Sequence, residues 1–138
     1  MSGVQPAPLV LIVDDFEDIR DAYADFFVFR GYRVAAAADG EQAIEQATAL
    51  LPDLILMDLS LPGIDGWEAV RRLRADARTQ RIPIVALTCH ALGGVRQSAL
   101  DAGCDAFIAK PCLPQDVAAE VRRILGLAED PKGTLQAG

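Results

Sequence analysis

Short apolar runs alternate with amphipathic stretches five times along the chain. Each run has the length of a strand, and several are rich in Val and Ile, which favour strands. The stretches between them repeat apolar side chains at the spacing of a helix with one buried face. The five predicted strands cover residues 9–13, 32–37, 54–57, 82–87 and 106–109.

The first two predicted helices have recognisable ends. The first covers about residues 17–30, and Gly31 follows it at the position of a C-terminal cap. Asp39 followed by Gln42 resembles a capping box at the start of the second helix, and Pro52 stops that helix.

The three later helices follow the same rules. Asp65 with Glu68 repeats the capping box, the fourth helix covers about residues 91–102, and the fifth follows Pro114. Five strand–helix repeats with nearly continuous apolar strands imply a parallel sheet covered on both faces, because right-handed crossovers place helices there. The sequence thus predicts a single doubly wound α/β domain.

The length of the chain, 138 residues, suits one domain with a single packed core. We expect residues 1–8 to form a disordered lead and residues 9–125 to form the folded domain. Residues 126–138 contain Gly and Pro with little apolar content, so we expect a flexible tail or linker there.

Net charge, the length of the first apolar run and the cysteine pattern argue against nucleic-acid binding, a membrane span and a disulfide framework. The formal net charge of −7 argues against nucleic acid as a partner, because phosphate backbones are held by clustered Lys and Arg. The apolar run at residues 9–13 is too short for a signal-peptide core or a membrane span. Cys89, Cys104 and Cys112 form no C-x-x-C pair, and their odd number argues against a disulfide framework. We therefore expect a cytoplasmic protein with reduced thiols and no membrane association.

Polar side chains follow four of the predicted strands. Asp14 and Asp15 follow the first strand, Asp58 the third, Thr88 the fourth and Lys110 the fifth. Ligands of open parallel sheets bind beyond these carboxyl ends, where the strand order reverses. The five polar residues therefore indicate a common site at one edge of the sheet.

Three converging carboxylates need compensating positive charge, because close pairs repel by roughly 4 kcal/mol at intermediate dielectric. Lys110 supplies one charge, and it is the only Lys outside the predicted tail of a chain that otherwise uses Arg. A hard cation with oxygen ligands would supply the rest, and Mg²⁺ suits a site with few protein ligands. The alternative is that each Asp caps a neighbouring helix.

Four motifs surround these strand ends in a characteristic order and spacing. They are Leu-Ile-Val-Asp14-Asp15-Phe16, Leu-Met-Asp58-Leu-Ser-Leu-Pro62-Gly63-Ile-Asp65-Gly66, Ile-Pro83-Ile-Val-Ala-Leu-Thr88 and Gly103-Cys-Asp105-Ala-Phe107-Ile-Ala-Lys110-Pro111. Together they resemble the receiver domains of response regulators, and the resemblance covers about residues 9–125. It implies a flavodoxin-like (βα)5 fold whose parallel five-stranded sheet has the strand order 2-1-3-4-5.

The resemblance also implies a role for each carboxylate. Asp58 would be the phosphoacceptor, a carboxylate nucleophile that takes a phosphoryl group from a phosphohistidine. Asp15, Asp58 and the backbone carbonyl of Ser60 would bind Mg²⁺ directly, with Mn²⁺ as an alternative ion. Asp14 would act on the metal through water.

Three further residues receive roles from the same resemblance. Lys110 would offset the charge of the phosphoryl oxygens, and Thr88 would hydrogen-bond one of them after transfer. Phe107 resembles the rotating aromatic residue of the switch. The peptide bond between Lys110 and Pro111 is typically cis in this family.

Three positions depart from the commonest family pattern. Phe107 lacks the hydroxyl of the frequent Tyr, and Cys89 replaces a very small residue after Thr88. His90, the sole histidine, lies where its side chain can overhang the acceptor. It is either a second active-site base or a partly exposed residue that tunes the access of water.

The predicted function is a receiver that accepts a phosphoryl group from a histidine kinase or histidine phosphotransferase. Its output would be a change in protein association on the surface of the fourth helix, fifth strand and fifth helix, with self-association as one form. We expect no enzymatic turnover beyond self-phosphorylation and slow self-dephosphorylation. A receiver domain excised from a hybrid histidine kinase is the alternative.

Two other functions share chemistry or fold with this prediction. A haloacid-dehalogenase-like phosphatase needs an acid two residues after its nucleophile, but Phe16 and Ser60 occupy those positions after Asp14 and Asp58. A flavodoxin-like cofactor binder needs a phosphate loop with free amides, whereas the corresponding turn reads Asp-Asp-Phe-Glu-Asp. Both are therefore disfavoured.

Overall fold

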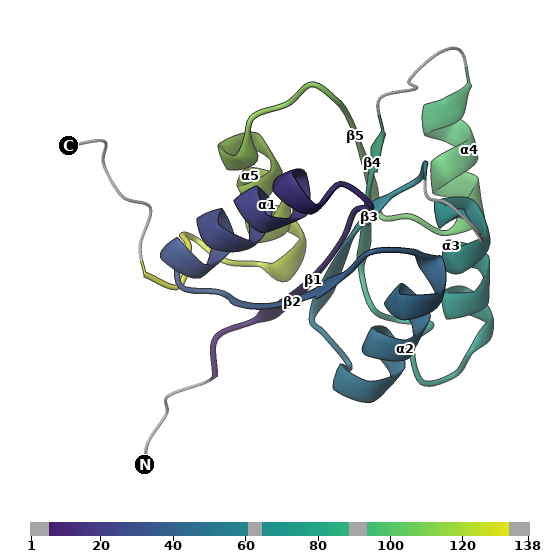
Figure 1. Cartoon of the computed structure of the whole chain (residues 1–138), viewed down its shortest axis with the longest axis horizontal. Coiled ribbons are helices and arrows are strands. Elements are labelled where there is room, and N and C mark those ends of the chain that lie inside the picture. The colour runs from purple at the N-terminus through teal and green to yellow at the C-terminus, as the bar shows by residue number, and fades with distance from the viewer. Residues whose placement is uncertain (1–5, 61–64, 89–93, 133–138) are drawn as a thin grey trace.

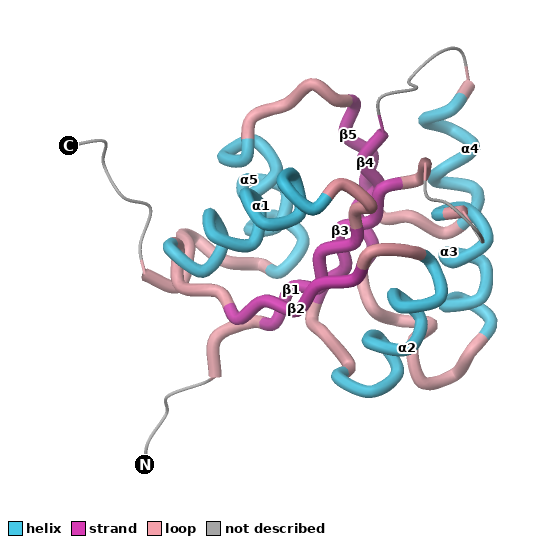
Figure 2. The backbone as a smooth tube through the Cα atoms, in the orientation of Figure 1, coloured by secondary structure: helices cyan, strands magenta, loops and turns pink. Residues whose placement is uncertain are grey.

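The computed structural model describes residues 6–60, 65–88 and 94–132. Five parallel strands form one sheet in the order β2-β1-β3-β4-β5, which confirms the predicted topology. The strands run through the centre of the molecule, with helices on either side (Figure 2). Their bounds are β1 Leu9–Val13, β2 Arg33–Ala37, β3 Leu54–Asp58, β4 Ile84–Thr88 and β5 Ala106–Ala109.

The helices cover both faces of the sheet, as the doubly wound arrangement requires. In Figure 1, α1 and α5 lie together on one face, and α2, α3 and α4 lie on the other. Within the described residues no helix is long and apolar enough to cross a bilayer. The bounds are α1 Glu17–Phe29, α2 Gly40–Leu50, α3 Gly66–Ala75, α4 Val95–Ala102 and α5 Pro114–Leu125.

Alternate side chains of the central strands fill two separate cores. Val10 and Ile12 of β1 pack with α1 and α5, whereas Leu11 and Val13 pack with α2 and α3. Because both faces are covered, β1, β3 and β4 are buried almost throughout, as their continuous apolar sequences predict. The parallel pairing then brings the carboxyl ends of these strands to the same edge of the sheet.

The predicted helix ends agree closely with the structure. The Asp39 side chain accepts a hydrogen bond from the Gln42 backbone N–H at 2.8 Å, as in a capping box. Gly31 follows α1 with a positive φ of 98°, the conformation that favours glycine at a C-terminal cap. The start of the predicted fourth helix, residues 91–93, lies outside the described residues, and α4 is described from Val95.

One strand prediction is shifted by the chemistry of proline. The predicted run at residues 82–87 becomes a strand at Ile84–Thr88. Pro83 has no N–H to donate to a ladder, although its carbonyl accepts a hydrogen bond from Ile55 N–H at 2.9 Å. The strand therefore begins after the proline, where Ile84 pairs with Ile55.

The two chain segments that flank the domain differ from the sequence expectation where they are described. Arg33 donates to the Pro8 carbonyl from its backbone N–H and to the Ala7 carbonyl from its side chain, so the end of the predicted lead is held against β2. Residues 126–132, predicted as a flexible tail, pack onto the domain, and Asp130 within them is only 2% exposed. Low apolar content misled the prediction because Asp130 of this segment is held by charged hydrogen bonds from Arg30 and Arg122.

Candidate functional site

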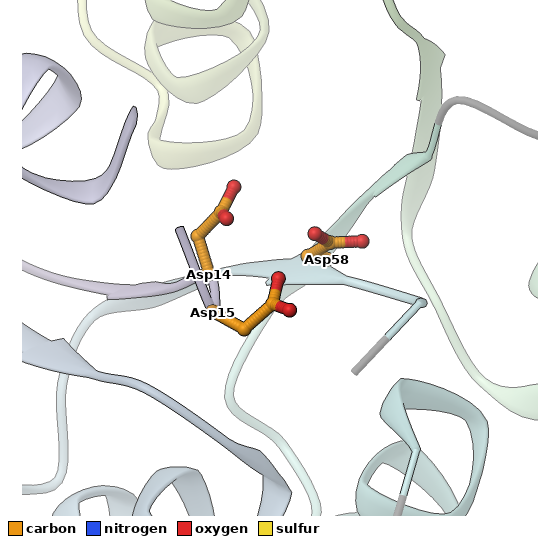
Figure 3. A group of neighbouring side chains, drawn as sticks. All are labelled: Asp14, Asp15 and Asp58. Atoms are coloured by element: carbon orange, nitrogen blue, oxygen red, sulfur yellow. The ribbon is translucent and has the colours of Figure 1, made fainter. Parts of the chain in front are cut away.

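Three carboxylates gather where β1 and β3 end, as the sequence predicts. Asp14 and Asp15 follow β1 directly, and Asp58 is the last residue of β3. Val13 pairs with Met57 in the sheet, which aligns the two strand ends. One oxygen from each of the three carboxylates lies within 4.8 Å of the others. Figure 3 shows the three side chains side by side at this edge.

Lys110 brings an ammonium group to the same cluster. Its Nζ atom lies 3.0 Å from Asp14 Oδ2 and 3.8 Å from Asp58 Oδ2. The backbone N–H of Lys110 donates to the Thr88 carbonyl at 2.8 Å, so the chain after β5 is tied to the end of β4. One ammonium faces three carboxylates, and the cluster keeps a net negative charge when all are ionised.

The environment of Asp58 disfavours its ionised form. Burial raises the pKa of Asp58, and the neighbouring charges of Asp14 and Asp15 raise it further. The Ser60 N–H, which donates to Asp58 Oδ1 at 2.8 Å, and the Lys110 ammonium oppose this rise without cancelling it. Additional positive charge at this site would therefore stabilise the ionised form of Asp58.

The alternative role of these aspartates as helix caps is not supported. The residue at the N-cap of α1 is Phe16, with no side-chain capping hydrogen bond, although Asp14 Oδ1 accepts the Phe16 N–H at 2.9 Å. The N-cap of α3 is Asp65 rather than Asp58. Asp15 and Asp58 are thus left with their oxygens facing the cluster.

Two residues that shape the site had not been recognised from the sequence. Arg20, in the first half of α1, donates from Nη1 to the Asp14 carbonyl at 2.8 Å and ties the helix to the end of β1. Gly66 begins α3 so close to β3 that an added Cβ would touch the Asp58 carbonyl and lie 2.5 Å from Leu59 Cα. The glycine directly after the Asp65 capping residue was the available signal for this close approach.

Thr88 and Phe107 lie on the neighbouring strands. Thr88 is the last residue of β4 and is 1% exposed. Phe107 lies on β5 and pairs with Ala86 of β4. The Phe107 ring is partly buried against the core that α2, α3 and α4 cover. Cys89 and His90, which the sequence placed beside these residues, lie outside the described residues. The Lys110–Pro111 peptide bond is cis, as predicted.

Comparison with known proteins identifies the family. The family model described as "Response regulator receiver domain" matches residues 10–122. Response regulator Rre1 of Synechocystis is 36% identical over 84% of this chain and 51% of its own length. The phosphate regulon transcriptional regulatory protein PhoB of Pseudomonas aeruginosa is 37% identical over 84% of this chain and also 51% of its length. The chain thus spans about half the length of these curated relatives.

Solved structures agree with the fold. The receiver domain of sensor histidine kinase PA1611 from Pseudomonas aeruginosa has a TM-score of 0.80 and 37% identity, and the alignment covers 87% of this chain and 98% of that one. That structure is described as having a magnesium ion coordinated in the active site cleft. Chemotaxis protein CheY4 of Vibrio cholerae has a TM-score of 0.80 and 29% identity, covering 86% of this chain and 98% of that one. The chain belongs to the response regulator receiver domains of two-component signalling.

Proposed function

We propose that this receiver takes a phosphoryl group on Asp58 from a histidine kinase or histidine phosphotransferase and thereby switches its protein associations. The observation that carries the proposal is the cluster of Asp14, Asp15 and Asp58, with Lys110 Nζ 3.8 Å from the Asp58 carboxylate. Three carboxylates with one ammonium form a site that a cation and a phosphoryl group would complete.

The donor set fits Mg²⁺, with Mn²⁺ as an alternative ion. All side-chain donors of the cluster are carboxylate oxygens, which hard cations prefer. We assign Asp15, Asp58 and the Ser60 carbonyl as direct ligands and Asp14 as a ligand through water. When bound, such an ion offsets the charge on the transferring phosphoryl oxygens. The magnesium in the cleft of the PA1611 receiver supports this assignment.

The residues of the chain prepare Asp58 for nucleophilic attack. The Ser60 N–H holds Oδ1, and Lys110 lies nearer Oδ2, so the carboxylate has a defined orientation. An Asp58 oxygen attacks the phosphorus of the phosphohistidine, the P–N bond breaks, and the imidazole leaves. The product is an acyl phosphate, whose added charge Lys110 helps to balance.

The switch would pass from the phosphoryl group to the neighbouring strands. Thr88 would donate a hydrogen bond to a phosphoryl oxygen, and Phe107 would then turn inward toward the space beneath α4. Because Phe107 has no hydroxyl, packing alone would hold it there. Output would leave through the surface of α4, β5 and α5, where a pre-existing equilibrium shifts.

Labelling with acetyl phosphate tests the acceptor directly. Wild type with Mg²⁺ should gain one phosphoryl group by intact mass, and EDTA should abolish the gain. Asp58→Asn should not be labelled, whereas Asp116→Asn, which changes an exposed acid at the start of α5, should label like wild type. Equal labelling of wild type and Asp58→Asn would refute the proposal.

The role of Lys110 is tested with a phosphoryl mimic. Lys110→Ala should lose most of the rise in melting temperature that beryllofluoride gives to wild type, because the mimic then lacks its ammonium partner. The metal can still balance the carboxylates of the resting state, so the variant should remain folded. An equal rise in both proteins would remove Lys110 from the phosphoryl site.

Two forms of the protein remain as candidates for the biological setting. Similarity to the receiver of a sensor histidine kinase supports a receiver that belongs to a hybrid kinase. The curated relatives include proteins named as transcriptional regulators and response regulators. These names support the other setting, in which the receiver belongs to a response regulator. In either setting we propose a cytoplasmic location and no nucleic-acid contact by this domain. Phosphotransfer from a purified kinase, followed by a pull-down of partners, would separate the two.

A further inference from the structure

The segment after α5 folds back and closes one end of the domain. We call residues 126–132 the C-terminal clasp. The Asp130 carboxylate at its centre is fully buried and accepts hydrogen bonds from Arg30 at 2.7 Å, Tyr32 at 2.9 Å and Arg122 at 3.1 Å. Arg30 is the residue after α1, Tyr32 is the residue before β2, and Arg122 lies in the last turn of α5. One carboxylate thus joins three elements.

Backbone contacts reinforce the clasp on the side of α1. The Lys132 N–H donates to the Arg30 carbonyl at 3.0 Å. Gly31, with its positive φ, lies so close that an added Cβ would be 2.8 Å from the Lys132 nitrogen. The Arg30 guanidinium also stacks 4.6 Å from the centre of the Phe26 ring. The segment is therefore fitted to the end of α1.

The same two helices border a groove at their other ends. α1 and α5 lie together on one face of the sheet, and the clasp lies beyond their C-terminal ends (Figure 1). A groove of about 610 Å³ lies between the first half of α1, including Ile19 and Tyr23, and the loop that joins β5 to α5. Lys110 and Cys112 of that loop line it. The groove therefore opens beside the phosphoacceptor site.

We propose that the clasp sets the spacing of α1 and α5 and so controls access to this groove. Apolar packing through Phe27 and Val121 holds the helices together but is non-directional. The hydrogen bonds of Asp130 have defined directions and fix the two helix ends. Since α1 is about 20 Å long, a small change at the clasp is carried to the groove as a tilt of the helix.

The regulatory meaning of this device rests on the proposed function. A protein that donates a phosphoryl group to Asp58 must approach the acceptor edge of the sheet, where the groove lies beside Lys110. A closed clasp would hold the groove narrow, and its release would widen it. The clasp would therefore tune how the domain receives a phosphodonor protein without touching the acceptor.

The thiol of Cys112 provides a probe of the groove that needs no phosphodonor. In a Cys89→Ser background the remaining thiols are Cys112 and the buried Cys104. Asp130→Asn should expose the amides of residues 127–132 to hydrogen exchange and raise the rate at which a maleimide modifies Cys112 by roughly tenfold. Glu129→Gln, which changes the exposed neighbouring acid, should leave both measurements unchanged.

The outcomes separate the clasp from the proposed function. Faster exchange in the clasp with an unchanged Cys112 rate would overturn the inference, because the clasp would then open without moving the groove. If the clasp stays closed in Asp130→Asn, the Asp130→Lys variant is used instead. Its added positive charge beside Arg30 and Arg122 should open the clasp by repulsion. Both variants are compared at temperatures where circular dichroism shows them folded. A wild type that acetyl phosphate does not label would refute the acceptor role alone.

Discussion

Asp58 and Asp130 are both buried aspartates, but their surroundings have opposite electrostatic balance. Asp58 shares its site with two other carboxylates and one ammonium, and burial raises its pKa. Burial also acts to raise the pKa of Asp130, but hydrogen bonds from Arg30, Tyr32 and Arg122 outweigh it and lower the pKa below the ordinary value. One region has too little positive charge, and the other has two guanidinium groups for a single carboxylate.

The contrast shows that burial alone does not decide what a carboxylate does. At the clasp, Arg30, Tyr32 and Arg122 already donate hydrogen bonds to Asp130, so this carboxylate is a stabilising structural group. At the strand ends the described residues set one ammonium against three carboxylates, so the negative charge is only partly compensated and additional positive charge would favour the ionised form of Asp58. The following predictions test this difference.

The largest effect is expected at the clasp. Asp130→Ala should lower the free energy of unfolding by about 3 kcal/mol, because Arg30 and Arg122 would remain partly buried without their carboxylate. Urea unfolding followed by circular dichroism measures the change. Glu129→Ala serves as the control and should cost less than about 0.5 kcal/mol. Equal losses in the two variants would mean that Asp130 has no special role.

The two aspartates should give stability profiles with opposite dependence on pH. The pKa of Asp130 is lowered, so its contribution is present above the ordinary pKa of about 3.9 and is lost as the pH falls through the folded-state value. The pKa of Asp58 is raised, so stability is lost as the pH rises from the ordinary value through the folded-state value.

Difference profiles of unfolding free energy isolate these contributions. Wild type minus Asp130→Asn should rise with pH over the acidic range, and wild type minus Asp58→Asn should fall. The measurements are made without divalent ions, so that only the chain's own charges act on Asp58. Two profiles with the same slope would contradict the assigned electrostatic balance.

Magnesium should distinguish the regions by stabilising only one of them. At a concentration ten times the dissociation constant, Mg²⁺ should add about 1.4 kcal/mol to wild type, because it binds the folded cluster. Asp130→Asn should show the same gain, and Asp58→Asn should show little. Calorimetric melts at several Mg²⁺ concentrations measure the gain, and an undiminished gain in Asp58→Asn would place the ion elsewhere.

The smallest effect concerns one hydrogen bond of the clasp. Tyr32→Phe removes the hydroxyl that donates to Asp130 but keeps the ring, which packs edge-on against Phe27 at 5.2 Å between centroids. The loss should be about 1 kcal/mol. In an Asp130→Ala background the same substitution should cost much less, and a double-mutant cycle measures the difference. Additive losses would show that the hydroxyl does not act through Asp130.

The sequence was sufficient to predict the gathering of carboxylates at the strand ends but not the clasp, and the reason is physical. Asp14, Asp58 and Lys110 each follow a short apolar run, and parallel strands bring such positions together whatever the details of packing. Asp130 is held by distant partners, and one of them, Arg30, lies one hundred residues earlier in the chain. No local sequence pattern indicates that pairing. A polar segment rich in Gly and Pro reads as flexible unless those distant partners are known.

The same distinction applies within the site. Gly66 matters because α3 starts against the backbone of Asp58. The glycine after Asp65 was a signal of a close approach, but it did not show which backbone lies there. Arg20 reads as an ordinary exposed helix position, yet it donates to the Asp14 carbonyl. Residue types and strand ends were predictable, whereas close backbone approaches depended on the final packing.

The two ends of the described residues are both hydrogen-bonded to residues 30–33, which lead from α1 into β2. Ala7 and Pro8 are hydrogen-bonded to Arg33, and Lys132 is hydrogen-bonded to Arg30, on either side of the turn that starts β2. This arrangement makes the domain a natural candidate for circular permutation, since a linker could join the two ends away from the carboxylate edge. New termini could then be opened in a surface loop, and the domain inserted into a host protein through them.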